Sequence, residues 1–155
     1  MPSNRRKGFH YERLAAKRIN SLLSQYKKEN ETWWAYRIPL SAGVMVIRNG
    51  NRIYLPGDVI VGCCGFGVQT VEVKSVAKLS RINRILKFVH CPFLMVHQHR
   101  SWHYWYRSTV PTCNGHPNGW HHVSEKEFTQ RLMEDIRRYK DKDNHDVVLI
   151  AGLQQ

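Results

Sequence analysis

The stretch Pro56-Gly57-Asp58-Val59-Ile60-Val61, followed by Val71-Glu72-Val73-Lys74, decides both the fold and the search for a function. Each piece has the pattern of a short apolar strand interrupted by charge. Because side chains alternate along a strand, Glu72 and Lys74 point to the same face. Burying an isolated carboxylate or ammonium group is expensive, and pairing the two repays only part of that cost. The pattern therefore indicates that something else on this face, such as a bound cation, compensates for the charge.

Asp58 opens its strand directly after a Pro-Gly turn, which lets it place a second carboxylate at the same edge as Glu72. Two carboxylates suit Mg²⁺, which fills its remaining positions with water and phosphate. Such a metal lowers the pKa of bound water and clamps a scissile phosphate, while Lys74 can orient the water and offset developing charge. The alternative interpretation is a simple salt bridge between Glu72 and Lys74 on a half-exposed strand. The upstream Gly-Asp and the basic chain favour the metal site.

Composition favours an anionic polymer as the partner. The 155 residues, one domain by length, carry 24 basic and 12 acidic side chains, a net charge of +12 with neutral histidines. No segment reaches the length of apolar residues that a membrane span requires, and the basic N-terminus has no apolar stretch behind it, so we expect no membrane segment and no signal peptide. We also expect no organic cofactor.

The cysteines do not form the pattern of a secreted disulfide framework. Cys63 and Cys64 are adjacent and Cys91 precedes a proline, so reduced thiols in a cytosolic protein are the better interpretation. A loop predicted at 108–122 raises the question of zinc, but its spacing matches no familiar zinc module. The side chains concerned are Cys113, His116, His121 and His122.

Periodicity predicts an α/β fold. A 3.6-residue apolar period indicates a helix from Phe9 to about Lys28, with Glu12 at the edge of its buried face. Alternating and apolar runs predict strands at 32–38, 58–63, 67–74, 93–98 and 102–107, and a hairpin at 44–55 turning at Asn49-Gly50. For residues 147–150, a short closing strand and a packed tail are both open. Further helices are predicted at 78–89 and about 125–140. We expect a central mixed sheet flanked by helices, with the site at a sheet edge.

Two basic segments are candidates for DNA contact. The first is an N-terminal arm, residues 1–8, with Arg5, Arg6 and Lys7; the second is a stripe at three-residue spacing on the predicted helix 78–89. The stripe consists of Lys78, Arg81, Arg84 and Lys87, of which the first three are the candidates for DNA contact. Phosphate contact and plain solvation are both open for each segment. The aromatic strand 102–107 is expected in the core or at a dimer surface, with base stacking as the alternative.

The order of helix-Glu12, strand-Asp58 and strand-Glu72-x-Lys74 resembles the PD-(D/E)xK nuclease superfamily. More narrowly, the chain resembles the archaeal-type Holliday junction resolvases, which also occur in viruses. The matching pieces, over roughly residues 5–107, are Arg6-Lys7-Gly8, Tyr11-Glu12-Arg13, Arg37, Ser41-Ala42-Gly43, Pro56-Gly57-Asp58 and Glu72-Val73-Lys74. The hairpin 44–55 looks like an insertion, and the extension 108–155 has no counterpart.

The resemblance implies a restriction-endonuclease-like fold and a Mg²⁺-dependent endodeoxyribonuclease, with Mn²⁺ as a possible substitute. Such an enzyme resolves four-way DNA junctions by symmetric cleavage as a homodimer, in the cytoplasm of a prokaryotic or virus-infected cell. Asp58, Glu72 and Glu12 would hold the metal, and Lys74 would serve the attacking water. Supporting roles in phosphate binding or catalysis would fall to Arg13, Arg37 and Ser41.

Three other functions stay open. One is a nuclease of the same chemistry that acts on linear, flapped or sequence-defined DNA, of a viral replication-repair or restriction type. Another is a non-catalytic DNA-binding module with this fold, which the intact set of carboxylates argues against. The last is an interaction protein whose basic surface is incidental, for which DNA binding would be absent at any salt concentration.

Overall fold

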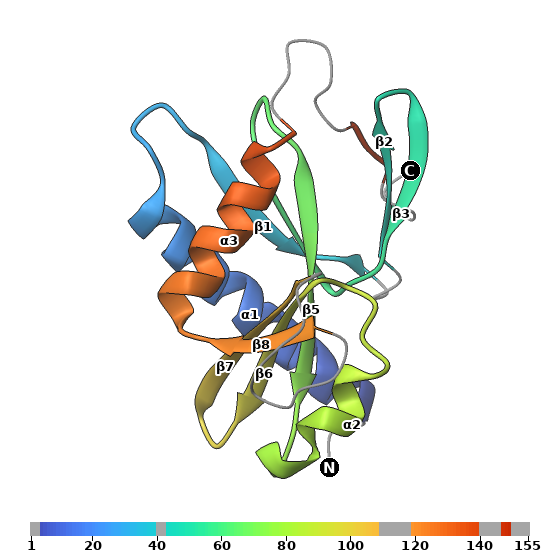
Figure 1. Cartoon of the computed structure of the whole chain (residues 1–155), viewed down its shortest axis with the longest axis vertical. Helices are drawn as coiled ribbons and strands as arrows, with labels where there is room; N and C mark the ends of the chain where they lie inside the picture. The colour runs from blue at the N-terminus through green and yellow to red at the C-terminus, as the bar shows by residue number, and fades with distance from the viewer. Residues whose placement is uncertain (1–3, 40–42, 109–118, 140–146, 150–155) are drawn as a thin grey trace.

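The computed structural model describes residues 4–39, 43–108, 119–139 and 147–149 (Figure 1). In chain order its elements are α1 (Asn4–Tyr26), β1 (Trp33–Arg37), β2 (Val44–Arg48), β3 (Asn51–Leu55), β4 (Val59–Cys63), β5 (Val68–Ser75), the 3₁₀ turn η2 (Leu79–Arg81), α2 (Ile82–Leu86), β6 (Phe93–Gln98), β7 (Ser101–Arg107), β8 (Trp120–Val123), α3 (Glu125–Arg137) and β9 (Val147–Leu149). Within these residues, no helix combines the length and apolarity needed to cross a membrane.

A six-stranded sheet with the order β1-β4-β5-β6-β7-β8 forms the centre of the molecule. All neighbouring strands are antiparallel except β5 and β6, which run parallel because η2 and α2 cross over between them. The predicted mixed sheet flanked by helices is therefore confirmed. A second, three-stranded sheet with the order β3-β2-β9 stands beside it (Figure 1).

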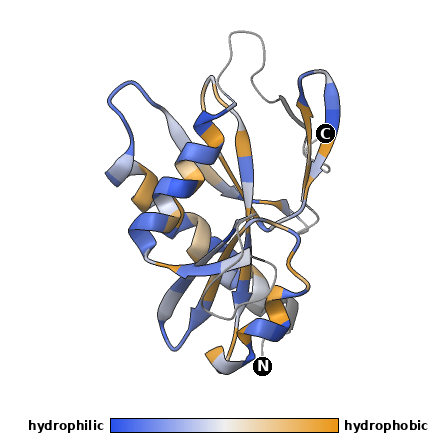
Figure 2. Ribbon diagram, viewed as in Figure 1, coloured by the Kyte–Doolittle hydropathy of each residue, from blue (hydrophilic) through white to orange (hydrophobic). Residues whose placement is uncertain are grey.

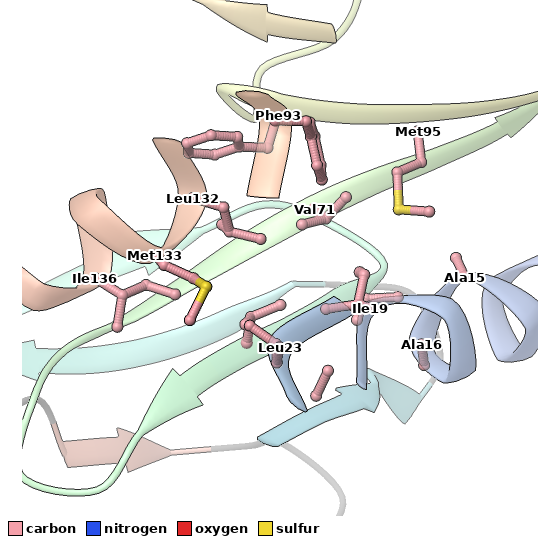
Figure 3. Packing of buried hydrophobic residues seen from close by; sticks show 14 of the residues in the cluster. Ala15, Ala16, Ile19, Leu23, Val71, Phe93, Met95, Leu132, Met133 and Ile136 are labelled. Carbon is pink, nitrogen blue, oxygen red and sulfur yellow. The ribbon is translucent and has the colours of Figure 1, made fainter. Parts of the chain in front are cut away.

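Helices α1 and α3 cover the same face of the central sheet. The apolar period of α1 places Ile19 and Leu23 against Val71, and α3 adds Leu132 and Ile136 to the same cluster (Figure 3). The polar sides of both helices face outward (Figure 2). This face holds the largest core cluster, and it fixes where α1 crosses β5.

The opposite face is covered by two smaller pieces. Ile82 and Leu86 of α2 pack on Leu94 and Trp105 of the central sheet. The hairpin β2–β3 covers the β1 and β4 side of this face, in a cluster that comprises Ile38, Val44, Val46, Ile60 and Val68. The hairpin turns at Asn49 and Gly50, as predicted, and residues 147–149 pair with β2 as a closing strand.

Three predicted boundaries are wrong. Helix α1 begins at Asn4, so the predicted arm is largely helical; the side chains of Arg5, Arg6 and Lys7 lie outside the described part. The predicted helix 78–89 is shorter in the structure and is divided into η2 and α2, and no side chain caps the N-terminus of either element. Residues 120–122, predicted as loop, belong to β8, where the pairing with β7 stacks His121 and His122 on aromatic rings of that strand.

Strand β7 is interior to the sheet, with β6 on one side and β8 on the other. Tyr104 is buried under α3 and Trp105 is buried under the other face. Both are core residues, which confirms the core interpretation for these two side chains, and the dimer surface stays a prediction.

Candidate active site

A cleft of about 430 Å³ opens where the N-terminal half of α1 passes β5 and the start of β4. It brings together the predicted side chains Glu12, Asp58, Glu72 and Lys74, from three elements that are distant in sequence. Gly8, Tyr11, Val73 and Ser75 complete its lining. The sequence pattern had marked four of these positions as chemical; their convergence comes from the crossing of α1 over the sheet.

The turn before β4 is built to hold Asp58 in this place. The Thr70 hydroxyl donates to the Pro56 carbonyl oxygen at 2.6 Å. A Cβ atom on Gly57 would lie 2.6 Å from the Thr70 Cβ, so only glycine allows the turn to lie this close to β5. The amide of Asp58 then donates to the Val71 carbonyl at 3.0 Å, and its carbonyl accepts from the Ile38 amide at 2.8 Å.

The Asp58 carboxylate accepts a backbone hydrogen bond from β5 at the point where the pairing of β4 with β5 ends. The β4–β5 register stops at the pair Val59 and Val71. The next inward-facing donor, the Val73 amide, donates instead to the Asp58 Oδ2 at 2.8 Å. A side chain that satisfies a buried backbone donor has little freedom to rotate, so Asp58 is held in one orientation toward the cleft.

Excess negative charge is the main electrostatic feature of the cleft. Asp58 is 7% exposed and Glu12 is 6% exposed. Burial, together with the nearby charge of Glu72 and the charge and hydrogen bond of Glu12, raises the pKa of Asp58 from 3.8 to about 8, although the Val73 amide opposes the shift. In the metal-free protein, the protonated form of the Asp58 carboxyl group is therefore favoured over a wider pH range than in a solvent-exposed aspartate.

Each of the other two carboxylates has a cationic neighbour. Arg37 Nη1 lies 3.4 Å from Glu12 Oε2, and its guanidinium group also covers the ring of Phe9 at 4.5 Å. Lys74 Nζ lies 3.4 Å from Glu72 Oε1, with the lysine side chain 45% exposed. The salt bridge of the alternative interpretation thus exists, but an exposed pair at this distance contributes only about 0–1 kcal/mol to stability.

The donor set fits a magnesium ion held by two carboxylates. Although Glu12, Asp58 and Glu72 line one cleft, no three His, Cys, Asp or Glu side chains among the described residues form a group that could together hold one metal ion. Mg²⁺ commonly uses one or two carboxylates and keeps several waters, so Asp58 and Glu72 suffice, with Glu12 beside them. A cation would also relieve the charge repulsion that, after burial, raises the pKa of Asp58.

The predicted phosphate-binding residues are spread more widely. Arg37 lies beside the cleft through its contact with Glu12, whereas Arg13, Lys78, Arg81 and Arg84 are exposed and do not line it. Ser41 lies outside the described residues, as do Cys113 and His116 of the possible zinc group. The two adjacent histidines of β8 stack on different rings, His121 on Tyr106 and His122 on Trp105.

Sequence reasoning missed the support beneath the cleft. The Cys91 thiol donates to the Thr70 carbonyl at 2.8 Å, and burial raises the pKa of this thiol to about 12, so it stays neutral. Cys63 and Cys91 are buried free thiols, as expected, while Cys64 is exposed. The position of Cys91 directly before a proline and a strand was the one available signal, and it indicated burial without indicating a partner.

The chain matches no model of a protein family, no curated protein and no solved structure. Function is therefore inferred from the chemistry of the cleft.

Proposed function

We propose that the protein is a Mg²⁺-dependent endodeoxyribonuclease whose active site is the cleft between α1, the turn before β4, and β5. The observation that carries the proposal is the buried Asp58 carboxyl group, held beside Glu72 and Glu12 with its pKa raised to about 8. Gathering carboxyl groups in this way costs stability, and such perturbed groups in clefts concentrate at functional sites. The net charge of +12 supports a polyanionic substrate.

In this proposal the residues of the cleft have separate roles. Asp58 and Glu72 hold the metal, assisted by Glu12. The bound metal would supply an activated water and neutralise charge on the scissile phosphate. Lys74, with its exposed ammonium group at the mouth of the cleft, orients the attacking water. Arg37 positions Glu12 and offers its remaining donors to the DNA backbone.

We further propose a restriction-endonuclease-like fold and a place among the PD-(D/E)xK nucleases. The support is the order of the elements: a carboxylate on the first helix, an aspartate before one strand, and Glu-x-Lys on the next, with all three meeting in one cleft. The resemblance of residues 5–107 to junction resolvases supports a four-way DNA junction as substrate and a homodimer as the working form. It also supports a cytoplasmic location in a prokaryotic or virus-infected cell.

The test is cleavage of a synthetic four-way junction in Mg²⁺, beside a linear duplex of equal length, with EDTA and Glu72→Ala as controls. We expect paired symmetric nicks on the junction alone, and none with either control. Equal cutting of both substrates would keep the nuclease site and refute the junction as the preferred substrate. Activity that survives in EDTA would refute the metal-dependent mechanism.

A second candidate is a DNA-binding module with this fold and no catalysis. The ion pair between Glu72 and Lys74 favours it, because a structural salt bridge is what the alternative interpretation of this strand requires. The junction-cleavage experiment described above distinguishes the nuclease from the binding module. Tight junction binding without cleavage, in both Mg²⁺ and Mn²⁺, would select the binding module.

A further inference from the structure

A second groove, of about 490 Å³, lies along α1 from His10 to Ser21. It runs between α1 and the end of the β6–β7 hairpin. Tyr11 lines both the groove and the cleft, so a ligand in one is adjacent to a ligand in the other. No role in the proposed chemistry uses the groove's remaining side chains.

The floor of the groove is aromatic. His97 and Trp102 face each other across β6 and β7, with ring centroids 5.0 Å apart. The ring of Tyr11 lies 4.7 Å from that of His97, which extends the row toward the cleft. Burial and the neighbouring His10 lower the pKa of His97, which favours the neutral form of its ring. A row of partly exposed neutral rings is the kind of surface on which nucleobases stack.

The rim of the groove is cationic. Lys17 of α1 and Arg100 of the β6–β7 turn are both exposed, and within the described part of the chain neither makes an ion pair. Arg18 also lines the groove, but it is committed to the fold, because its guanidinium group lies 2.5 Å from Glu125 Oε2. Lys17 and Arg100 are therefore the cations available to a ligand's phosphates.

The β6–β7 turn keeps Arg100 in place at a conformational cost. His99 and Arg100 have φ angles of 48° and 65°, the left-handed conformation that a two-residue type I′ turn requires. The β2–β3 hairpin meets the same requirement with the favoured pair Asn49 and Gly50, at 53° and 78°. A non-glycine side chain in this conformation is disfavoured, and such strain concentrates at functional positions.

We propose that this groove binds an unpaired DNA strand beside the cleavage site, with bases stacked on Trp102, His97 and Tyr11 and phosphates held by Lys17 and Arg100. The proposal rests on the proposed nuclease function, because the same DNA would continue into the cleft past Tyr11. Its consequence is a preference for DNA whose bases are unstacked next to the scissile phosphate. A continuous duplex cannot insert its bases between α1 and the hairpin.

The test is a fluorescence anisotropy titration of the full chain, in EDTA, with a labelled single-stranded oligothymidylate and with a duplex of equal length. The double variant His99→Asn/Arg100→Gly converts the turn to the favoured pair and should raise the thermal midpoint. It should nevertheless weaken single-strand binding about threefold to tenfold and reduce the salt slope by about 0.7. Matched controls are His99→Asn alone, because His99 does not line the groove, and Lys28→Ala, an exposed lysine past the far end of α1.

Two further variants separate the phosphate and base contacts. We expect Lys17→Ala to weaken single-strand binding as the turn variant does. Trp102→Leu should weaken it about fivefold or more through lost stacking. Duplex binding should change less than about twofold in all of them. The proposal would be refuted if the variants lost equal affinity for single-stranded and duplex DNA. It would also be refuted if a turn variant with a raised thermal midpoint bound single strands as the wild type does. Tighter binding of a single-stranded RNA than of the DNA would refute it as well.

Failure of the nuclease proposal gives a different result. If no DNA is cut in Mg²⁺ but the variants still bind single-stranded DNA more weakly than the wild type in EDTA, the proposed role of the groove is supported and the nuclease proposal is refuted. If a junction is cut but the variants bind single strands like the wild type, the enzyme stands and the groove falls.

Discussion

At the scale of single residues, Asp58 has one role in the fold and another in the proposed chemistry. Its carboxyl group replaces a backbone acceptor for the Val73 amide and at the same time faces two other carboxyl groups. The first role requires only an oxygen acceptor. The second role destabilises the ionised form, so the pH dependence of folding separates the two.

Replacing Asp58 by Asn should remove a pH-dependent part of the stability. Because the folded-state pKa of about 8 lies above the ordinary 3.8, the folded protein retains a proton that the unfolded chain has released. The stability contributed by Asp58 is therefore complete below pH 4 and is lost as the pH rises through 8. Asparagine keeps the Val73 acceptor without the charge. At pH 9, Asp58→Asn should exceed the wild type in unfolding free energy by more than about 1 kcal/mol.

Urea denaturation without divalent metal at pH 5 and pH 9 measures this difference. The stabilities of the two proteins should diverge as the pH rises. Parallel pH profiles for wild type and Asp58→Asn would show that Asp58 is ionised in the folded protein, contrary to the charge repulsion described for the cleft. Added Mg²⁺ should narrow the gap at pH 9, because a cation stabilises the ionised carboxylate of the wild type alone.

At the scale of elements, an ion pair joins α3 to the segment that links α1 to β1. Arg137 Nε and Nη2 donate to the two carboxylate oxygens of Glu31 at 2.8 and 2.6 Å. The Trp33 indole N–H donates to the same carboxylate at 3.0 Å. Glu31 is 8% exposed. The hydrogen bond from Arg137 is the main cause that lowers the pKa of Glu31 from 4.5 to about 2, against the effect of burial.

Replacing Glu31 by Gln should destabilise the fold by about 2 kcal/mol at neutral pH, because Arg137 would lose a buried partner. A lowered pKa means that the stabilisation is present above pH 4.5 and is lost as the pH falls toward 2. The difference between the two proteins should therefore shrink in acid. The matched control is Glu127→Gln, which breaks the exposed pair with Arg131 and should cost less than about 0.5 kcal/mol. Equal losses of unfolding free energy in both variants would contradict a stabilising role for the buried ion pair between Glu31 and Arg137.

Sequence patterns predicted the elements with strong local signals. The 3.6-residue period of α1 and the Asn49-Gly50 turn give those elements within a few residues, and the charged positions just before β4 and on β5 mark the cleft. Contacts between segments that are distant in the sequence could not be predicted from these local patterns. The placement of β8 beside β7 depends on aromatic rings that come into contact only in the folded sheet. The groove at Trp102 depends on how α1 crosses the sheet. Neither leaves a periodic signal in the chain.

At the scale of the whole molecule, the excess of basic side chains should make DNA binding strongly salt-dependent. We expect the affinity for a four-way junction to fall about a hundredfold between 50 and 200 mM KCl, which corresponds to about four phosphate contacts. Anisotropy titrations in EDTA over this range measure the slope. An affinity that is insensitive to salt would contradict phosphate binding and leave the basic surface unexplained.

The central claim is that the carboxylates of the cleft perform metal-dependent cleavage. Single-turnover cleavage of a labelled four-way junction in Mg²⁺, by the wild type and by Asp58→Asn, tests it most directly, because asparagine preserves the hydrogen bond that holds the turn. We expect the variant to bind the junction within about twofold of the wild type and to cleave it at least about a hundredfold more slowly. Cleavage by Asp58→Asn at the wild-type rate would contradict the claim.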